Sequence, residues 1–193
     1  NIGITMAANA VLELIDRYAI DPDNVGFLAL GTESSKDNSA GAVIVKGMVD
    51  KALEARGRRR LSRHCEVPEF KHACLGGIYG LKAALRYAAS DGADSQAIVV
   101  ASDIAEYERD SSGEPTQGAG AVALLVDSDP QLLEIDLAHA GKASDYRGPD
   151  FRKPIARHFL DGRVGSQSAF RDFPVFSGKY SAFAYLDQTY HAV

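Results

Sequence analysis

Tryptophan is absent from this sequence, and cysteine and methionine each occur only twice. Cys65 and Cys74 cannot form a disulfide framework, and no Cys/His spacing indicates a zinc site, so we expect a reducing compartment, the cytoplasm, and no metal. No apolar run approaches the roughly 20 residues that span a bilayer, so we expect no membrane segment. The net charge of -5 also argues against general nucleic-acid binding.

The composition that remains is that of an ordinary globular protein, with 46% hydrophobic and 24% charged residues. A chain of 193 residues can form one substantial core or part of a larger fold. It begins in an amphipathic helical pattern without a basic leader and ends in another helical pattern without a stop signal. We therefore expect it to be a segment of a longer chain.

Helical and strand patterns alternate along the sequence, which predicts an α/β protein. The second expected strand leads through a turn at Cys74 into a helix that should bury Ile78, Leu81, Leu85 and Ala88. We expect the last two strands to form an antiparallel pair, followed by an irregular segment over 142–176. The other expected helices cover 5–18, 40–55 and 177–193, and the expected strands cover 25–30, 66–72, 96–102, 118–126 and 132–141.

Cys74 lies where a strand gives way to the first turn of a helix. Free amide groups at a helix N-terminus favour a thiolate, and they could also hold the oxyanion of a bound thioester. Gly76 and Gly77 would leave space for a substrate to approach the backbone. Most single cysteines are inert packing residues, so both interpretations of Cys74 stay open at this point. Cys65 has no such turn, and we expect it only to pack.

Five motifs in order resemble the 3-hydroxy-3-methylglutaryl synthases of the thiolase superfamily. They are LGTESSKDNSAG, PEFKHACLGGIYGLKAAL, SDIAEY with PTQGAGAVALLV, GPDFRKP and FPVFSGKYSAFAYL. The resemblance implies a thiolase-like five-layered αβαβα fold, of which this chain covers most of the N-terminal half, and a homodimer. Residues 1–141 would form that incomplete half, and 142–193 would be a family-specific segment and helix leading to the other half.

The resemblance also implies roles for particular residues. Cys74 would be the nucleophile that takes an acetyl group, and Glu33 the general base that removes a proton from the acetyl methyl group. A partly desolvated carboxylate suits that step. Tyr107 would line the acyl pocket, unless it is a plain packing residue. Asp37, Asp103 and Asp150 would support the site, unless they only cap turns.

A third catalytic group, a histidine, is not matched in this sequence. The five histidines present lie outside the family's histidine motif, so we expect them to be structural or surface residues and the isolated chain to be inactive. They are His64, His72, His139, His158 and His191.

Several departures point to one branch of the family. Leu75 stands where enzymes that use coenzyme A usually have tyrosine, and the segment between Glu33 and Cys74 is longer. HCEVPEFKHACLGG is similar to the variants that install β-branches in polyketides, with both substrates carried on the phosphopantetheine of acyl carrier proteins. A basic run would dock the acidic face of these partners, unless it is only a solvated helix end. The run consists of Arg56, Arg58, Arg59, Arg60 and Arg63.

Two rival functions stay open. One is a hydroxymethylglutaryl-coenzyme A synthase of primary metabolism. The other is a non-catalytic half that binds acyl chains or scaffolds a partner subunit. For the carrier-protein enzyme and for the coenzyme A enzyme alike, we expect no bound cofactor, because the substrates arrive on phosphopantetheine.

Overall fold

The computed structural model describes residues 2–35, 40–107, 109–111, 113–147, 151–152, 175–176 and 178–193. The chain divides into two compact units, one made of Asn1–Ile104 with Gly118–Leu137 and the other of Ala105–Gln117 with Ala138–Val193. The expected division at residue 141 stays a prediction. Within the described residues, no helix is both long enough and apolar enough to cross a membrane.

A four-stranded sheet forms the centre of the first unit, with the strand order β2-β1-β3-β4. Strand β1 pairs in parallel with both β2 and β3, and every one of its residues is buried. Such a strand is covered on both faces, which is why its sequence is a continuous apolar run. The strands are β1 (Val25–Thr32), β2 (Glu69–Lys71), β3 (Gln96–Ala105) and β4 (Gly118–Val126).

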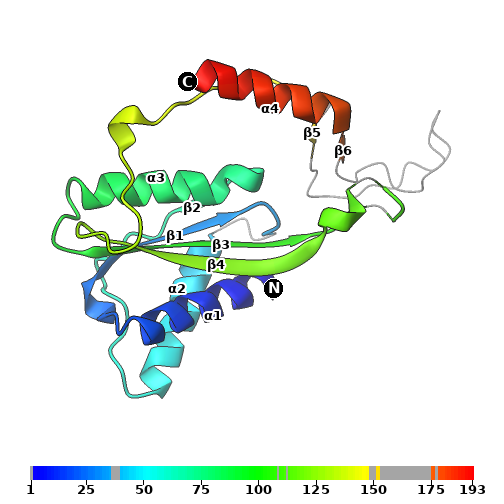
Figure 1. Cartoon of the computed structure of the whole chain (residues 1–193). Coiled ribbons are helices and arrows are strands. Elements are labelled where there is room, and N and C mark those ends of the chain that lie inside the picture. The colour runs from blue at the N-terminus through cyan, green and yellow to red at the C-terminus, as the bar shows by residue number, and fades with distance from the viewer. Residues whose placement is uncertain are drawn as a thin grey trace. The chain divides into compact units, whose positions relative to one another are not determined.

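Helices cover both faces of this sheet (Figure 1). α1 (Ile2–Arg17) and α2 (Gly41–Ala55) pack on one face, and α3 (Gly76–Ala88) packs on the other. The larger core lies under α1 and α2, where Val11, Ile15 and Val45 are fully buried at helical spacing. This arrangement confirms the predicted α/β class and the predicted helices.

α3 packs through small side chains, which corrects one detail of the prediction. Gly80, Ala84 and Ala88 face the sheet, whereas Ile78 is 52% exposed. Residues spaced by four lie on one side of a helix, and small ones let the helix backbone approach the sheet closely. A methyl group added at Gly80 would lie 3.1 Å from a methyl carbon of Val99. Because α3 packs closely on the sheet, the side of the helix with small residues is buried, and the side with Ile78 is not.

The strand expected at 132–141 is wrong. This segment has an irregular backbone with one short turn, Leu137–His139, and both Leu132 and Leu133 are exposed. An apolar run becomes a strand only when a neighbouring strand pairs with it and another layer covers it. No strand of the described residues pairs with 132–141.

β2 is also shorter than expected, at three residues, although the chain before it already touches β1. Leu28 N donates to Glu66 O at 2.8 Å, and Leu30 N donates to Pro68 O at 3.1 Å. Pro68 has no backbone N–H to donate, which limits regular pairing before Glu69.

The second unit holds two short antiparallel strands and a helix. β5 (Phe151–Arg152) pairs with β6 (Val175–Phe176), and α4 (Gly178–Ala192) confirms the helix predicted at the end of the chain. Tyr107 also belongs to this unit.

Candidate active site

The segment that follows β1 is fastened to β3 through one oxygen of Asp103. Oδ1 of Asp103 accepts hydrogen bonds from Thr32 Oγ1 at 3.0 Å and from the Glu33 amide at 2.7 Å. It also accepts from the Ser34 amide at 3.0 Å and from Ser34 Oγ at 2.7 Å. Ser34 Oγ in turn accepts from Ile104 N at 2.9 Å. The backbone that carries Glu33 is therefore held in one position relative to the end of β3.

Glu33 is half-buried at this strand end, and its Oε2 atom is withdrawn from solvent. A carboxylate held out of bulk water next to a fixed backbone is placed to remove a proton from a bound substrate. The predicted position of Glu33 in a loop at the carboxyl end of a strand is confirmed.

Cys74 lies exposed in a single 3₁₀ turn, Ala73–Leu75, that runs directly into α3. The backbone of Ala73, just before the thiol, has φ of 36°, in the left-handed region that alanine avoids. Such a conformation costs about 1–3 kcal/mol and persists only where surrounding structure imposes it. Leu75 N donates to His72 O at 2.8 Å, and Gly76 N donates to Ala73 O. The turn therefore presents the thiol outward at the start of the helix.

Glycines bring the two segments together. A methyl group added at Gly31 would overlap the backbone nitrogen of Gly77, and one at Gly76 would lie 3.0 Å from Thr32 N. The end of β1 thus contacts the first turn of α3 backbone against backbone. Glu33 lies two residues after Gly31, and Cys74 lies two residues before Gly76, so the two predicted site residues emerge from adjacent segments.

The same contact gives Gly76 a packing role. An added methyl there would lie 2.6 Å from Phe70 O, and Gly76 is buried. At Gly77 an added methyl would lie 3.1 Å from the side chain of Ala101. That these glycines leave space for a substrate stays a prediction.

Other predicted site residues lie elsewhere or outside the described chain. Asp37 and Asp150 fall outside the described residues. The Tyr107 amide donates to Gln117 Oε1 at 3.5 Å, and its ring faces Gly113 within the second unit. Its place in an acyl pocket stays a prediction.

The arginine run forms ion pairs with acidic residues of the first unit. Arg56 and Arg58 both reach Asp16, and Arg59 reaches Asp21 and Asp23. Arg63 is exposed and has no ion pair within the described part of the chain. An acidic partner would have to compete with these aspartates, so docking stays a prediction. The shortest N–O distances are 2.7 Å for Arg56–Asp16, 2.6 Å for Arg58–Asp16, 2.7 Å for Arg59–Asp23 and 3.1 Å for Arg60–Glu54.

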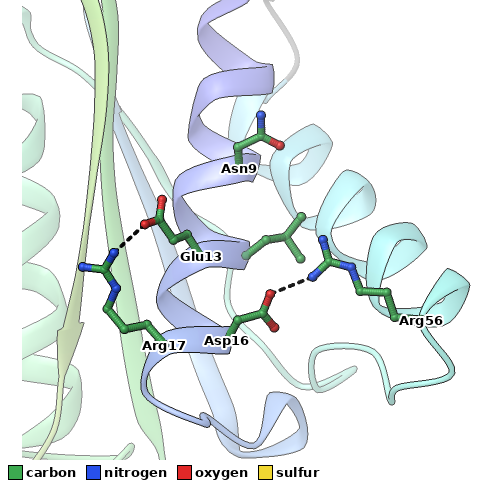
Figure 2. Close-up of a pocket in the computed structure, with 6 residues that line it drawn as sticks. Asn9, Glu13, Asp16, Arg17 and Arg56 are labelled. Carbon is green, nitrogen blue, oxygen red and sulfur yellow. Dashed lines mark hydrogen bonds and ion pairs between the residues drawn. The ribbon is translucent and has the colours of Figure 1, made fainter.

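An open pocket of about 520 Å³ lies beside this run, between α1 and the end of α2 (Figure 2). Glu13 forms an ion pair with Arg17, and Asp16 forms one with Arg56, so the charged side chains that line the pocket are already paired with each other. The pocket lies on the face of the sheet opposite α3 and is separate from Cys74. Its other lining residues are Asn9 and Leu12.

Cys65 behaves as the packing residue that was predicted. It is partly buried against the core under α1 and α2, and Sγ donates to Glu66 O at 3.4 Å. Burial raises the pKa of Cys65 to about 12. The two thiols therefore differ in surroundings, because Cys65 is partly buried and Cys74 is exposed at the start of a helix.

Comparison with known proteins points to one family. The family model for the N-terminal part of hydroxymethylglutaryl-coenzyme A synthase matches residues 3–131. A relative from Haloferax volcanii named hydroxymethylglutaryl-CoA synthase is 35% identical over 167 residues, which are 85% of this chain and 36% of the relative.

Two solved structures agree over almost the whole chain. MvaS in complex with 3-hydroxy-3-methylglutaryl coenzyme A is 37% identical, with a TM-score of 0.80 over 98% of this chain and 40% of that one. The HMG synthase of the curacin biosynthetic pathway, in complex with an acetyl donor-ACP, is 29% identical, with a TM-score of 0.71 over 98% and 41%. The chain thus spans about two fifths of the length of these proteins.

Proposed function

Because this chain belongs to the hydroxymethylglutaryl-CoA synthase family, we propose that it supplies the nucleophile and the general base of a condensing acyltransferase. The family's fold is thiolase-like, and the chain corresponds to its N-terminal half, as the sequence predicted. The observation that carries the proposal is the contact between Gly31 and Gly77, which places Glu33 and Cys74 on adjacent segments.

The first step loads the enzyme. The thiolate of Cys74 attacks the carbonyl carbon of an acetyl thioester, and the bond to the carrier's sulfur breaks. The carrier's thiolate leaves and takes up a proton from solvent, and acetyl is transferred to Sγ. Backbone amides in the first turn of α3 lie next to Cys74, and no side chain caps that turn among the described residues. Amides in this position stabilise negative charge on the carbonyl oxygen.

The second step forms the carbon–carbon bond. Glu33 removes a proton from the methyl group of acetyl-Cys74, and the resulting carbanion equivalent attacks the β-carbonyl carbon of the acceptor thioester. The alkoxide takes up a proton from a histidine that the family resemblance places outside this sequence. Water then cleaves the Cys74 thioester, which frees the thiol and leaves a 3-hydroxy-3-carboxymethyl product.

For the donor and the acceptor, acyl carrier proteins are our first proposal. The curacin synthase, a neighbour at 29% identity, is solved with an acetyl donor-ACP, and Arg63 offers an exposed cation for an acidic partner. Coenzyme A thioesters are the second candidate, because MvaS is more similar at 37% and is solved with a coenzyme A product. Both carriers present the thioester on phosphopantetheine, and we propose that the complete enzyme is a homodimer.

Intact-protein mass spectrometry of the complete protein tests the proposal. The protein is mixed in parallel with an acetylated carrier protein and with acetyl-coenzyme A, and the site of acetylation is mapped by peptide analysis. Acetyl on Cys74 from the carrier protein alone supports carrier-dependent condensation, and equal or faster loading from coenzyme A supports the second candidate. No adduct from either donor in folded protein would overturn the nucleophile assignment and favour a non-catalytic half. Cys74→Ser is the control.

A further inference from the structure

Cys74 lies on a short link whose two ends are fixed at the same place on β1. Before the link, β2 pairs with the end of β1 as far as Lys71, which lies opposite Thr32. After the link, α3 begins at Gly76, where an added methyl group would lie 3.0 Å from Thr32 N. The link consists of the four residues 72–75, and it has to leave the end of β1 and return to it.

This short path accounts for the strained backbone at Ala73. The chain turns sharply within the link, and Ala73 has φ of 36°. Alanine rarely adopts the left-handed region and keeps it only where the surroundings impose it. Leu75 N donates to His72 O at 2.8 Å, but the side chain of His72 makes no capping hydrogen bond to the turn. The backbone that carries Cys74 is therefore under a strain that favours other conformations.

One side-chain contact bridges the link. The ring of His72, at its start, lies against the ring of Tyr79 in α3, with the ring centroids 5.0 Å apart and the planes inclined by 51°. Aromatic rings attract each other in tilted arrangements at this separation. His72 is exposed and Tyr79 is 43% exposed, so core packing does not require the pair. The pair joins the residue before the strained Ala73 directly to the helix.

We propose that His72 and Tyr79 are positioning residues that hold the strained link and so orient Cys74 for acetyl transfer. The proposal rests on the proposed function, because it concerns the loading of Cys74. Without the ring pair the link can relax, and the thiol then moves relative to the α3 amides that stabilise the carbonyl oxygen. Neither ring transfers a proton, so another aromatic ring can replace either one.

Alanine and phenylalanine substitutions separate the ring contact from the other properties of the two residues. Tyr79→Ala and His72→Ala each remove the pair. Tyr79→Phe and His72→Phe keep two rings and remove the hydroxyl group or the ring nitrogens. Tyr18→Ala, at a tyrosine that is 62% exposed and follows α1, is the matched control.

Two measurements are made on the complete protein. Rapid-quench mass spectrometry gives the rate of Cys74 acetylation at saturating concentrations of acetylated carrier protein and, in parallel, of acetyl-coenzyme A. Urea denaturation gives the stability of each variant. A saturating donor removes differences in donor affinity, so the rate reports on the bound complex.

In Tyr79→Ala and in His72→Ala we expect acetylation to slow by about three- to tenfold, because an aromatic pair shifts an equilibrium by a factor of this order. The double alanine variant should lose no more than either single variant, since each substitution already removes the whole pair. Both phenylalanine variants and Tyr18→Ala should keep most of the rate. The urea midpoint should change little in all of them, because both rings are exposed.

Unchanged acetylation in either folded alanine variant would overturn the inference, as would losses that multiply in the double variant. An equal loss in His72→Phe and His72→Ala would also overturn it, because the ring nitrogens and not the contact would then matter. A urea midpoint that falls along with the rate would assign the pair to the fold instead. If an alanine variant does not fold, the corresponding leucine variant decides. Absence of acetylation in the unsubstituted protein would overturn the proposed function, and the inference with it.

Discussion

Asp103 shows how much can depend on a single atom. Its Oδ1 accepts four of the hydrogen bonds that hold the Glu33 segment, and a charged acceptor makes such bonds stronger than a neutral one. Asp103→Asn replaces the carboxylate with a neutral amide and also introduces N–H groups. If the side-chain amide rotated, its N–H groups would face the N–H and O–H donors of Thr32, Glu33 and Ser34.

For Asp103→Asn we therefore expect condensation to slow by about 10²-fold, because the base shifts. Acetylation of Cys74 should change little. Rates of both steps in the complete protein measure this difference. Asp94→Asn, at an exposed position before β3, is the control. Equal losses in both steps would mean that Asp103 supports the fold in general and not the base in particular.

Cys65 and Cys74 should differ sharply in reactivity. Burial raises the pKa of Cys65 to about 12, so its reactive thiolate is scarce at pH 8, whereas Cys74 is exposed. Brief iodoacetamide treatment of folded protein should label Cys74 and spare Cys65 in a peptide map. Labelling of both thiols at similar rates would contradict the burial of Cys65.

The same pKa shift affects stability in alkali. In the unfolded chain the Cys65 thiol ionises above about pH 9, while in the folded protein it stays protonated up to about pH 12. Between these values the unfolded state binds fewer protons, so the free energy of unfolding falls as pH rises. Cys65→Ser should weaken this fall in urea titrations at pH 8 and pH 10.

Residues that belong to a motif could be singled out from the sequence, whereas features fixed by tertiary contacts could not. Cys74 and Glu33 were singled out by motifs that resemble a known family, and the structure places them on adjacent segments. The positive φ of Ala73 had no sequence signal, because glycine commonly adopts this conformation and alanine does not. The hydrogen bond from Ala42 N to Glu69 Oε2 had no sequence signal either, because the two residues lie 27 positions apart in the chain.

At the scale of elements, the contact between β1 and α3 is what the site depends on. Gly31→Ala would force its methyl into the backbone of Gly77. Backbone cannot rotate aside as a side chain can, so the strand and the helix must separate. We expect the free energy of unfolding to fall by about 1–3 kcal/mol, as for overpacking in a core, and acetyl transfer to Cys74 to fall with it.

Urea denaturation measures the loss, and Gly47→Ala is the matched control. Gly47 lies in α2, and an added methyl there meets no atom within 4 Å. Replacing an exposed helical glycine by alanine should stabilise the protein by about 0.5–1 kcal/mol. If the two variants changed stability alike, the close contact at Gly31 would not exist in solution.

Elements with strong local patterns were predicted well, and those defined by their neighbours were not. The continuous apolar run of β1 predicts a buried strand, and the helical spacing of apolar residues in α1 predicts a helix. Ile78 was placed on the wrong face because glycine and alanine carry no hydrophobic signal for close packing. Segment 132–141 has the composition of a strand, but no strand of the described residues pairs with it.

At the scale of the whole molecule, electrostatics decides whether the arginine run serves a partner. Four of its five arginines are engaged by acidic residues, and Arg63 is the exposed exception within the described chain. Arg63→Glu should therefore slow acetyl transfer from a carrier protein several-fold at low salt and leave the thermal midpoint unchanged.

Stopped-flow or quenched transfer assays at several salt concentrations would show this difference, which should shrink as screening increases. Arg86→Glu, near the end of α3, makes the same change in charge on the other side of the sheet. Equal slowing by both variants would indicate a general charge effect without docking at Arg63.

The two edge strands of the sheet, β2 and β4, differ in length and in exposure. β2 is short, whereas β4 offers nine residues at the other end, with Val122 63% and Leu124 45% exposed and no further strand beside it among the described residues. A long apolar edge is a template for pairing with another copy of the same chain. This 193-residue chain, made alone, should therefore tend to aggregate through β4, so a low yield of it would not count against the proposed function.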